Sequence, residues 1–237
     1  MEIRNGFIVG IFNYCDRWCD ACAFTSRCRL FADAAEIEAS LDPGLKALVE
    51  APALGRETAP PPPWLEELLR EMDEALLEPA DGAELREPSL PTEHLAIEQR
   101  VHDYGLRTYA WLQQRKFLSN DPVDPHAVIV WFHILIGTKT HRALHGLAED
   151  QPEDRDWPAD YDGSAKVALL GIDRSHAAWL ELIERRVVTD PEAAPFIADL
   201  VWLGEALERV FPAARAFVRP ALDEPEEVSK LLARERS

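Results

Sequence analysis

The sequence predicts an all-α protein, an antiparallel bundle of about four long helices that follows an N-terminal segment rich in cysteine. Three observations support this fold class. Ala, Leu, Glu and Arg recur at helical spacing, whereas Gly and Val are sparse. Long apolar stripes alternate with breaks that contain proline or glycine. The chain has 237 residues, of which 47% are hydrophobic, and is therefore long enough to bury a sizeable core.

The first two long helices are expected on either side of an Asp-Pro break. One begins at Thr92, a predicted N-cap, and its stripe runs from Leu95 through Leu112 to about residue 117. The next begins at Asp124 and Pro125 and extends to Gly146. Because its first half is apolar on nearly every side, we expect it to be the central helix of the bundle.

The last two long helices follow a turn predicted at residues 160–163. The third is expected over residues 164–186, with Val167, Leu170 and Leu182 facing inward. The fourth begins at the run Thr189-Asp-Pro and ends before Pro212. Short connections between amphipathic helices favour antiparallel neighbours, which predicts the bundle.

Four segments follow from this assignment. Residues 1–41 hold the cysteines and a short helix at 32–41, and residues 42–91 form an acidic, Pro-rich linker with one amphipathic helix from Trp64. The bundle core occupies residues 92–218, and residues 219–237 form a charged tail.

Charge and hydropathy exclude several classes of partner. The formal net charge is −18, from 43 acidic and 25 basic side chains, and such a field repels phosphate, so no nucleic-acid partner is expected. The longest apolar stretch, residues 127–137, is much shorter than the roughly 20 residues that cross a bilayer. The N-terminal residues lack the basic stretch and the long apolar run of a secretion signal, so export is not expected. We therefore expect no membrane partner and a cytoplasmic protein whose thiols stay reduced.

All the cysteines of the chain fall within one short segment. Cys15, Cys19, Cys22 and Cys28 have the spacing C-x3-C-x2-C-x5-C, which supplies the four thiolates that either a zinc ion or a [4Fe-4S] cluster needs. Structural zinc sites usually combine two CxxC pairs, and only one is present here. The spacing therefore predicts a metal centre and favours the [4Fe-4S] cluster, with zinc as the alternative.

Two local resemblances concern this segment. CDACAFTSRC, residues 19–28, resembles half of the iron-sulfur loop of DNA glycosylases of the endonuclease III type. That likeness implies the cluster but not the activity, since no helix-hairpin-helix signature is found. The first three cysteines match the C-x3-C-x2-C spacing of radical S-adenosylmethionine enzymes, which place it in a β/α barrel. No alternating strands follow the motif here. The fourth cysteine, Cys28, also favours a cluster in which every iron has a cysteine ligand, which leaves no open iron for a cofactor.

A broader resemblance covers two longer segments. NYCDRWCDACAFTSRC at residues 13–28 and DGSAKVALLGIDRSHAAW at residues 162–179 resemble an uncharacterised bacterial family. The order of segments matches over most of the chain. The resemblance implies no particular activity.

Charged side chains occur on helix faces that are otherwise apolar. Lys139 and Arg142 lie one turn apart on the second long helix, and Lys166 and Asp173 share a side of the third. These four could form a pocket for an anionic ligand. They could instead form a salt-bridge network, in which Asp173 pairs with Lys139 or Arg142, because an unpaired buried charge is costly. We favour the network.

Histidines also recur on the second long helix. His141 and His145 have the i, i+4 spacing, as do Glu98 and His102 on the first helix, but no HExxH and no Glu-x-x-His motif occurs. This excludes the usual zinc-hydrolase and di-iron patterns. Each histidine is expected to be a surface residue or a hydrogen-bonded core residue.

Three functions remain. The first is a cytoplasmic metal-binding protein with a [4Fe-4S] cluster in a redox, sensing or structural role, for which a protein redox partner is expected. The second is a zinc-stabilised protein-interaction module. The third is an enzyme that acts on an anionic small molecule in a pocket of the bundle. The sequence does not decide whether the protein is an enzyme.

Overall fold

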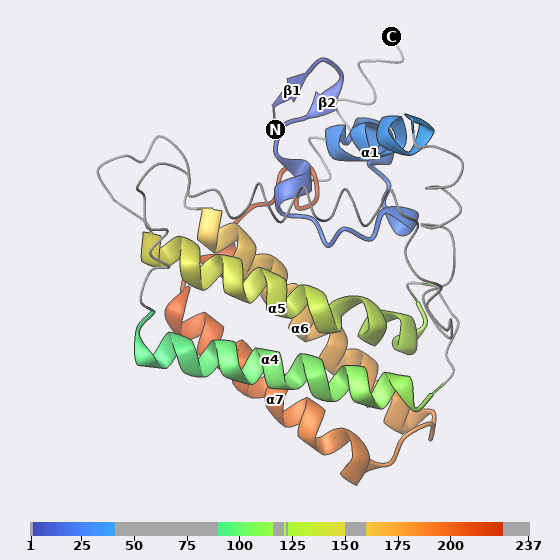
Figure 1. The fold of residues 1–237 in the computed structure, drawn as a ribbon, viewed down its shortest axis with the longest axis vertical. Helices are drawn as coiled ribbons and strands as arrows, with labels where there is room; N and C mark the ends of the chain where they lie inside the picture. Colours follow the sequence, from blue (N-terminus) through green and yellow to red (C-terminus); the bar gives the residue numbers. More distant parts are fainter. Residues whose placement is uncertain (1, 41–89, 116–120, 122, 150–159, 225–237) are drawn as a thin grey trace, which may run out of the picture. The chain divides into compact units, whose positions relative to one another are not determined.

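The computed structural model describes residues 2–40, 90–115, 121, 123–149 and 160–224. Four long helices dominate it: α4 (Thr92–Gln113), α5 (Pro125–Glu149), α6 (Asp160–Glu184) and α7 (Asp190–Val210). Successive helices run in opposite directions, and α4 packs against both α5 and α7, so the four close into an antiparallel bundle (Figure 1). The predicted all-α bundle is confirmed.

The chain divides into two compact units. One comprises residues 1–33 and 88–237, and therefore holds both the cysteines and the bundle. The other comprises residues 34–87. Residues 41–87 of this unit, which include the predicted linker helix from Trp64, lie outside the described residues. The short helix α1 (Arg29–Ser40) begins three residues before the predicted start, directly after Cys28.

The predicted starts of two helices are confirmed by the residues at which these helices begin. The Asp124 carboxylate accepts a hydrogen bond from the His126 backbone N–H at 3.0 Å, and Pro125 is the first residue of α5. Thr189 is the N-cap of α7. Helix α4 instead begins at Thr92 itself, with Pro91 at the N-cap position.

The turn predicted at residues 160–163 is wrong, because these residues form the first turn of α6. Asp160 and Asp162 place two carboxylates at the positive end of the helix dipole. Asp160 also accepts hydrogen bonds from Arg142 of α5, at 2.6 and 3.0 Å. The pairing with α5 stabilises helical backbone where Gly163 had suggested a break.

Small residues on α6 bring it close to α5, and these two helices share the most extensive interface of the bundle. A Cβ atom at Gly171 would lie 2.9 Å from Phe132 Cδ1 and 3.0 Å from Ile136 Cγ1, which is closer than side-chain contacts allow. Further along α6, Trp179 is fully buried and stacks on Phe196 with ring centroids 4.3 Å apart.

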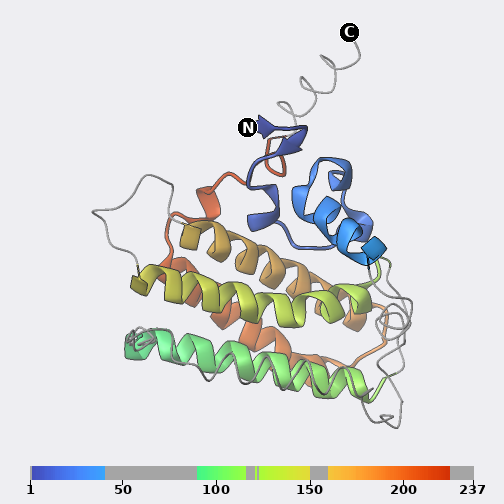
Figure 2. The same cartoon turned by 45° about the horizontal axis from the view of Figure 1, so that its top comes forward.

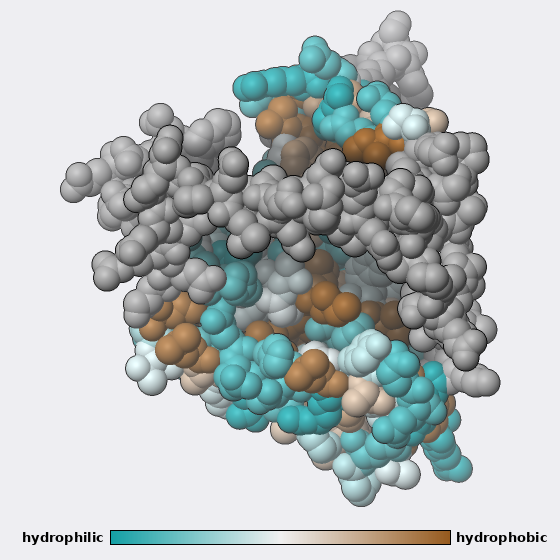
Figure 3. Space-filling view, in the orientation of Figure 1, coloured by the Kyte–Doolittle hydropathy of each residue, from teal (hydrophilic) through white to brown (hydrophobic). Residues whose placement is uncertain are grey.

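The inward faces follow the predicted stripes with local exceptions. Val167 and Leu182 are buried as expected, whereas Leu95 at the start of α4 is exposed and Trp111 near its end is buried. Over α4, the surface in Figure 3 is mostly hydrophilic with isolated hydrophobic spots. Leu106 is one of the exposed apolar residues of this helix. Single exposed apolar residues of this kind are ordinary on a folded protein.

A buried ion-pair network joins α4 to α7 and was not predicted. Asp199 of α7 is buried and accepts hydrogen bonds from Arg100 at 2.9 Å and from Arg107 at 2.6 Å. Because both arginines share one carboxylate, its charge is compensated inside the interface.

The structure adds a β-hairpin that the all-α prediction omitted. Strands β1 (Ile3–Arg4) and β2 (Phe7–Ile8) pair antiparallel across Asn5 and Gly6, whose φ angles are 51° and 84°. Positive φ at both central residues defines the type I′ turn that Asn-Gly favours.

The hairpin has its own small core. Ile8 and Ile11 pack with Ala221, and all three are buried. Ala221 lies in the segment predicted as a charged tail, so the chain remains packed beyond residue 218. The rest of that tail, residues 225–237, lies outside the described residues.

Candidate metal centre

The four cysteines lie on short turns of the segment between β2 and α1. Cys15 follows the 3-10 helix η1 (Ile11–Asn13), Cys19 opens η2 (Cys19–Ala21), and Cys28 follows η3 (Thr25–Arg27). All four are partly buried free thiols, and together they line one small cavity, whose apolar walls include Ile11, Phe12 and Phe31. The turns therefore direct the side chains of a 14-residue stretch to a common space.

The four thiols lie near enough to affect one another electrostatically. Burial raises the pKa of Cys19, and electrostatic repulsion from Cys15, Cys22 and Cys28 raises it further. Burial also raises the pKa of Cys15. Both shifts disfavour the thiolate form in the protein without a bound cation.

Local backbone geometry supports this arrangement. Arg17 adopts a φ angle of 60° and turns the chain sharply between Cys15 and Cys19. The backbone N–H of Trp18 donates to the Asp16 carboxylate at 3.1 Å, and the N–H of Phe24 donates to Cys22 Sγ at 3.4 Å. The N–H of Phe24 thus supplies a hydrogen-bond donor at this sulfur atom.

The cysteine segment docks on the side of the bundle formed by α5 and α6 (Figure 2). Asp16 is held twice, because Trp131 Nε1 donates to its carbonyl oxygen and Arg174 donates to its carboxylate, both at 2.7 Å. Trp18 is buried and stacks on Trp131 with centroids 5.2 Å apart. These contacts fix the position of Cys15 and Cys19, which flank the docked residues.

Tyr14, which precedes Cys15, occupies a notch at the start of α6. Its ring lies over Gly163, where a Cβ atom would be 2.3 Å from Tyr14 Cε1, and it packs on Phe217 at 4.8 Å between centroids. Burial and the neighbouring Asp160 carboxylate raise the pKa of Tyr14 to about 12. The absence of a side chain at position 163 is what admits this ring.

A buried lysine lies beside the segment. Lys139 of α5 is only 5% exposed, and its Nζ donates to the Asn13 carbonyl oxygen at 2.8 Å. Burial lowers its pKa, as do Arg142 and Arg17, whereas the Cys15 sulfur acts in the opposite direction. Within the described residues no carboxylate forms an ion pair with this ammonium group.

The structure does not bring Lys139, Arg142, Lys166 and Asp173 into one pocket. Arg142 pairs with Asp160, whereas Lys166 donates to the Arg215 carbonyl oxygen at 2.6 Å. Asp173 pairs with Arg215, not with Lys139 or Arg142 as the sequence had suggested. Arg215 follows α7 and lies 42 residues from Asp173, so the sequence gave no local signal of this partner.

An open cavity of about 580 Å³ adjoins the cysteines. Cys15 and Cys22 line its wall together with Arg174 and Glu181 of α6. The cavity therefore lies between the cysteine segment and helices α5 and α6, and it leaves Cys15 and Cys22 accessible from there.

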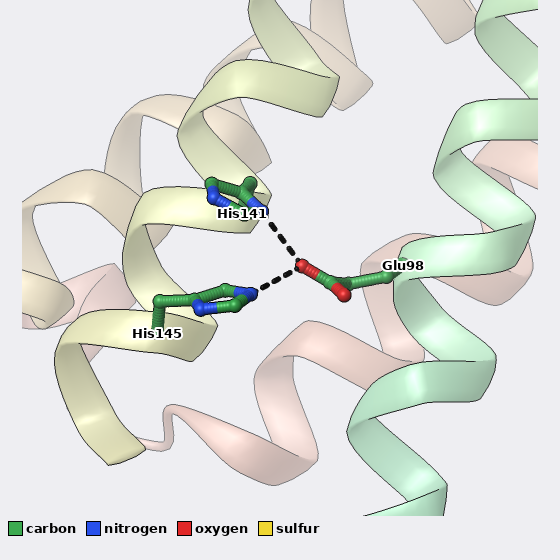
Figure 4. Close-up of side chains that lie close together, drawn as sticks. All are labelled: Glu98, His141 and His145. Carbon is green, nitrogen blue, oxygen red and sulfur yellow. Dashed lines mark hydrogen bonds and ion pairs between the residues drawn. The ribbon is translucent and has the colours of Figure 1, made fainter. Parts of the chain in front are cut away.

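The structure also brings together three further side chains that can bind a metal, and sequence spacing did not predict them as one group. His141 and His145 of α5 and Glu98 of α4 place one ligand atom each within 4.8 Å of one another (Figure 4). The i, i+4 spacing of the histidines was the available signal. The participation of Glu98 depends on how α4 packs against α5, which sequence spacing does not specify.

Comparisons with protein-family models, with curated proteins and with solved structures found no match. Of the helices that the structure describes, none combines the length and the apolar character that crossing a membrane requires. Arguments about function therefore depend on the residues themselves.

Proposed function

We propose that this chain is a cytoplasmic metal-binding protein in which Cys15, Cys19, Cys22 and Cys28 hold a [4Fe-4S] cluster with a redox or sensing role. The observation that carries the proposal is the cavity lined by all four free thiols. Four thiolates complete the coordination of a cube, one at each iron.

The spacing of the cysteines in the sequence favours the cube over zinc. Structural zinc sites usually combine two CxxC pairs, and only one such pair, Cys19 and Cys22, is present here. In a cube each thiolate binds a different iron, so one short run of chain can supply all four ligands. This spacing supports an iron-sulfur centre, with zinc as the alternative that the test must exclude.

The surroundings fit an anionic cluster. Four thiolates outweigh the iron-sulfide core in charge, and the buried ammonium group of Lys139 next to the segment offsets part of that charge. The N–H of Phe24, which is directed at Cys22 Sγ, also places a partial positive charge beside the site. Trp18 is buried and stacks on Trp131, which gives the segment an apolar neighbour on the bundle. Bound there, the cluster would supply one-electron redox chemistry.

The test is anaerobic purification followed by analysis of iron, acid-labile sulfide and zinc. We expect a brown protein with about four irons and four sulfides per chain. Cys28→Ser should lose most of the iron, whereas Ser26→Ala, an exposed neighbour in the same loop, should retain it. A colourless protein with one zinc per chain would reject the cluster and leave the zinc-stabilised interaction module as the better proposal.

Lys139→Met is expected to lower the reduction potential of the cluster. A unit charge at about 10 Å in a medium of effective dielectric constant near 20 contributes roughly 1.7 kcal/mol, or on the order of 70 mV for one electron. Removing this positive charge disfavours the more negative, reduced state. Arg142→Met is the control, because Arg142 is exposed and paired with Asp160. Potentiometric titration measures both, and equal potentials for the Lys139 variant and the native chain would contradict the assignment.

A further inference from the structure

The bundle holds a group of metal-ligating side chains on a different face of α5 from the cysteine segment. Lys139, which contacts that segment, and His141 are two residues apart, and at about 100° per residue they point in nearly opposite directions. His141 and His145 are one turn apart, with ring centroids separated by 4.0 Å. They therefore form one surface that faces α4.

Both imidazoles converge on a single atom. Oε1 of Glu98 lies 2.8 Å from His141 Nδ1 and 2.9 Å from His145 Nε2, so the three ligand atoms enclose one point between α4 and α5 (Figure 4). Because a carboxylate only accepts hydrogen bonds, His141 Nδ1 and His145 Nε2 act as the donors in this arrangement. A cation bound here would replace both hydrogen bonds, and each neutral imidazole would then carry its proton on its other ring nitrogen.

The separations are close to those of a coordination sphere. Zinc binds imidazole nitrogen and carboxylate oxygen at about 2.1 Å, which places neighbouring ligand atoms about 3.0 Å apart in octahedral geometry and about 3.4 Å apart in tetrahedral geometry. The observed separations of 2.8 and 2.9 Å are slightly shorter than these values, and the three ligand atoms all lie within 4.8 Å of one another. The Glu98 carboxylate would move outward to admit the ion at the point where the two imidazoles converge.

The donor set and the exposure indicate the kind of ion. Two imidazoles and one carboxylate suit Zn²⁺ and neighbouring divalent transition metals better than Ca²⁺ or Mg²⁺, which prefer oxygen. The His141 side chain is 65% exposed, whereas those of Glu98 and His145 are 25% and 19% exposed. His141 and Glu98 also line an open cavity between the helices, which leaves room for water as a further ligand.

We propose that Glu98, His141 and His145 bind one divalent transition-metal ion, with Zn²⁺ as the expected species, at a site that keeps open coordination positions. Three protein ligands with an open position are the pattern of exchangeable or catalytic zinc, as opposed to closed structural zinc. The site is independent of the proposed cluster. The net charge of −18 favours the approach of cations.

Zinc titration of the full-length protein, with its cysteine site in the state in which it is isolated, tests the proposal. We expect one additional Zn²⁺ per chain and a higher melting temperature, since the ion joins α4 to α5. His141→Ala and Glu98→Gln should each weaken this binding at least about tenfold. His176→Ala, a partly exposed histidine of α6 outside the cluster, should leave it unchanged.

Co²⁺ separates this site from the thiols. Bound by nitrogen and oxygen, Co²⁺ shows weak ligand-field bands without the strong charge-transfer absorption that thiolate ligands give. Circular dichroism of the same variants verifies that they fold. The proposal is overturned if no further ion binds, if the cobalt spectrum shows sulfur ligation, or if folded His141→Ala binds as tightly as the native chain. Its failure would leave the cysteine cluster unaffected.

Discussion

Gly163→Ala is expected to displace the cysteine segment from the bundle without unfolding the helices. The new Cβ atom would lie 2.3 and 2.4 Å from two carbons of the Tyr14 ring and 2.9 Å from Phe217 Cζ. Overpacking of this kind typically lowers the free energy of unfolding by about 1 to 3 kcal/mol. The higher helix propensity of alanine offsets at most about 1 kcal/mol of this loss. The Tyr14 ring must leave its notch, and Cys15 is the next residue.

The effect should appear as a loss of iron with retained helicity. We expect the variant to release iron faster than the native chain and to be cleaved sooner by protease near residues 13–19. Gly137→Ala is the matched control, because a Cβ atom at that position of α5 has no neighbour within 4 Å. It should keep its iron and be as stable as the native chain or more so. Equal iron retention in both variants would mean that Tyr14 does not hold the segment in place.

Trp179→Ala is expected to destabilise the whole bundle by about 3 to 5 kcal/mol, because it removes a large, fully buried side chain and leaves a cavity. The indole stacks on Phe196 of α7 at 4.3 Å and meets Trp111 of α4 edge-on at 4.7 Å between centroids. One side chain of α6 therefore connects three helices. A loss of this size is a large part of the stability of an ordinary domain.

Urea denaturation followed by circular dichroism measures this loss. Leu180→Ala is the control on the adjacent residue, which is about half exposed, and should change the free energy of unfolding by less than about 0.5 kcal/mol. A similar small change for Trp179→Ala would show that the core repacks around the missing indole, and would contradict its central position.

The sequence determined the fold class because the relevant signals are local. Apolar residues at helical spacing, the Asp124-Pro125 start and the Thr189 cap specify helices without reference to partners. Close spacing likewise pointed to the four cysteines as one group, and they line one cavity. Metal binding by these cysteines stays a prediction, and so does the choice of metal, since zinc and iron-sulfur clusters use the same ligands.

Two local features of the sequence have a structural role that was not predicted. The dipeptide Asn5-Gly6 is a strong hairpin signal, yet strands of two residues carry too little alternation to be noticed beside long helices. Gly163 suggested a turn, although glycine at this position serves the packing of Tyr14 and the backbone stays helical.

Only the tertiary structure decided which distant side chains meet. Asp173 pairs with Arg215, and Glu98 reaches His141 and His145 across two helices. The docking of Asp16 on Trp131 and Arg174 likewise joins residues more than 100 positions apart. Periodicity fixes which face of a helix is buried, but the rotation and sliding of one helix against another depend on how side chains interlock. The second candidate metal site arises from that packing, whereas the candidate site at the cysteines was predicted from the spacing of its four residues alone.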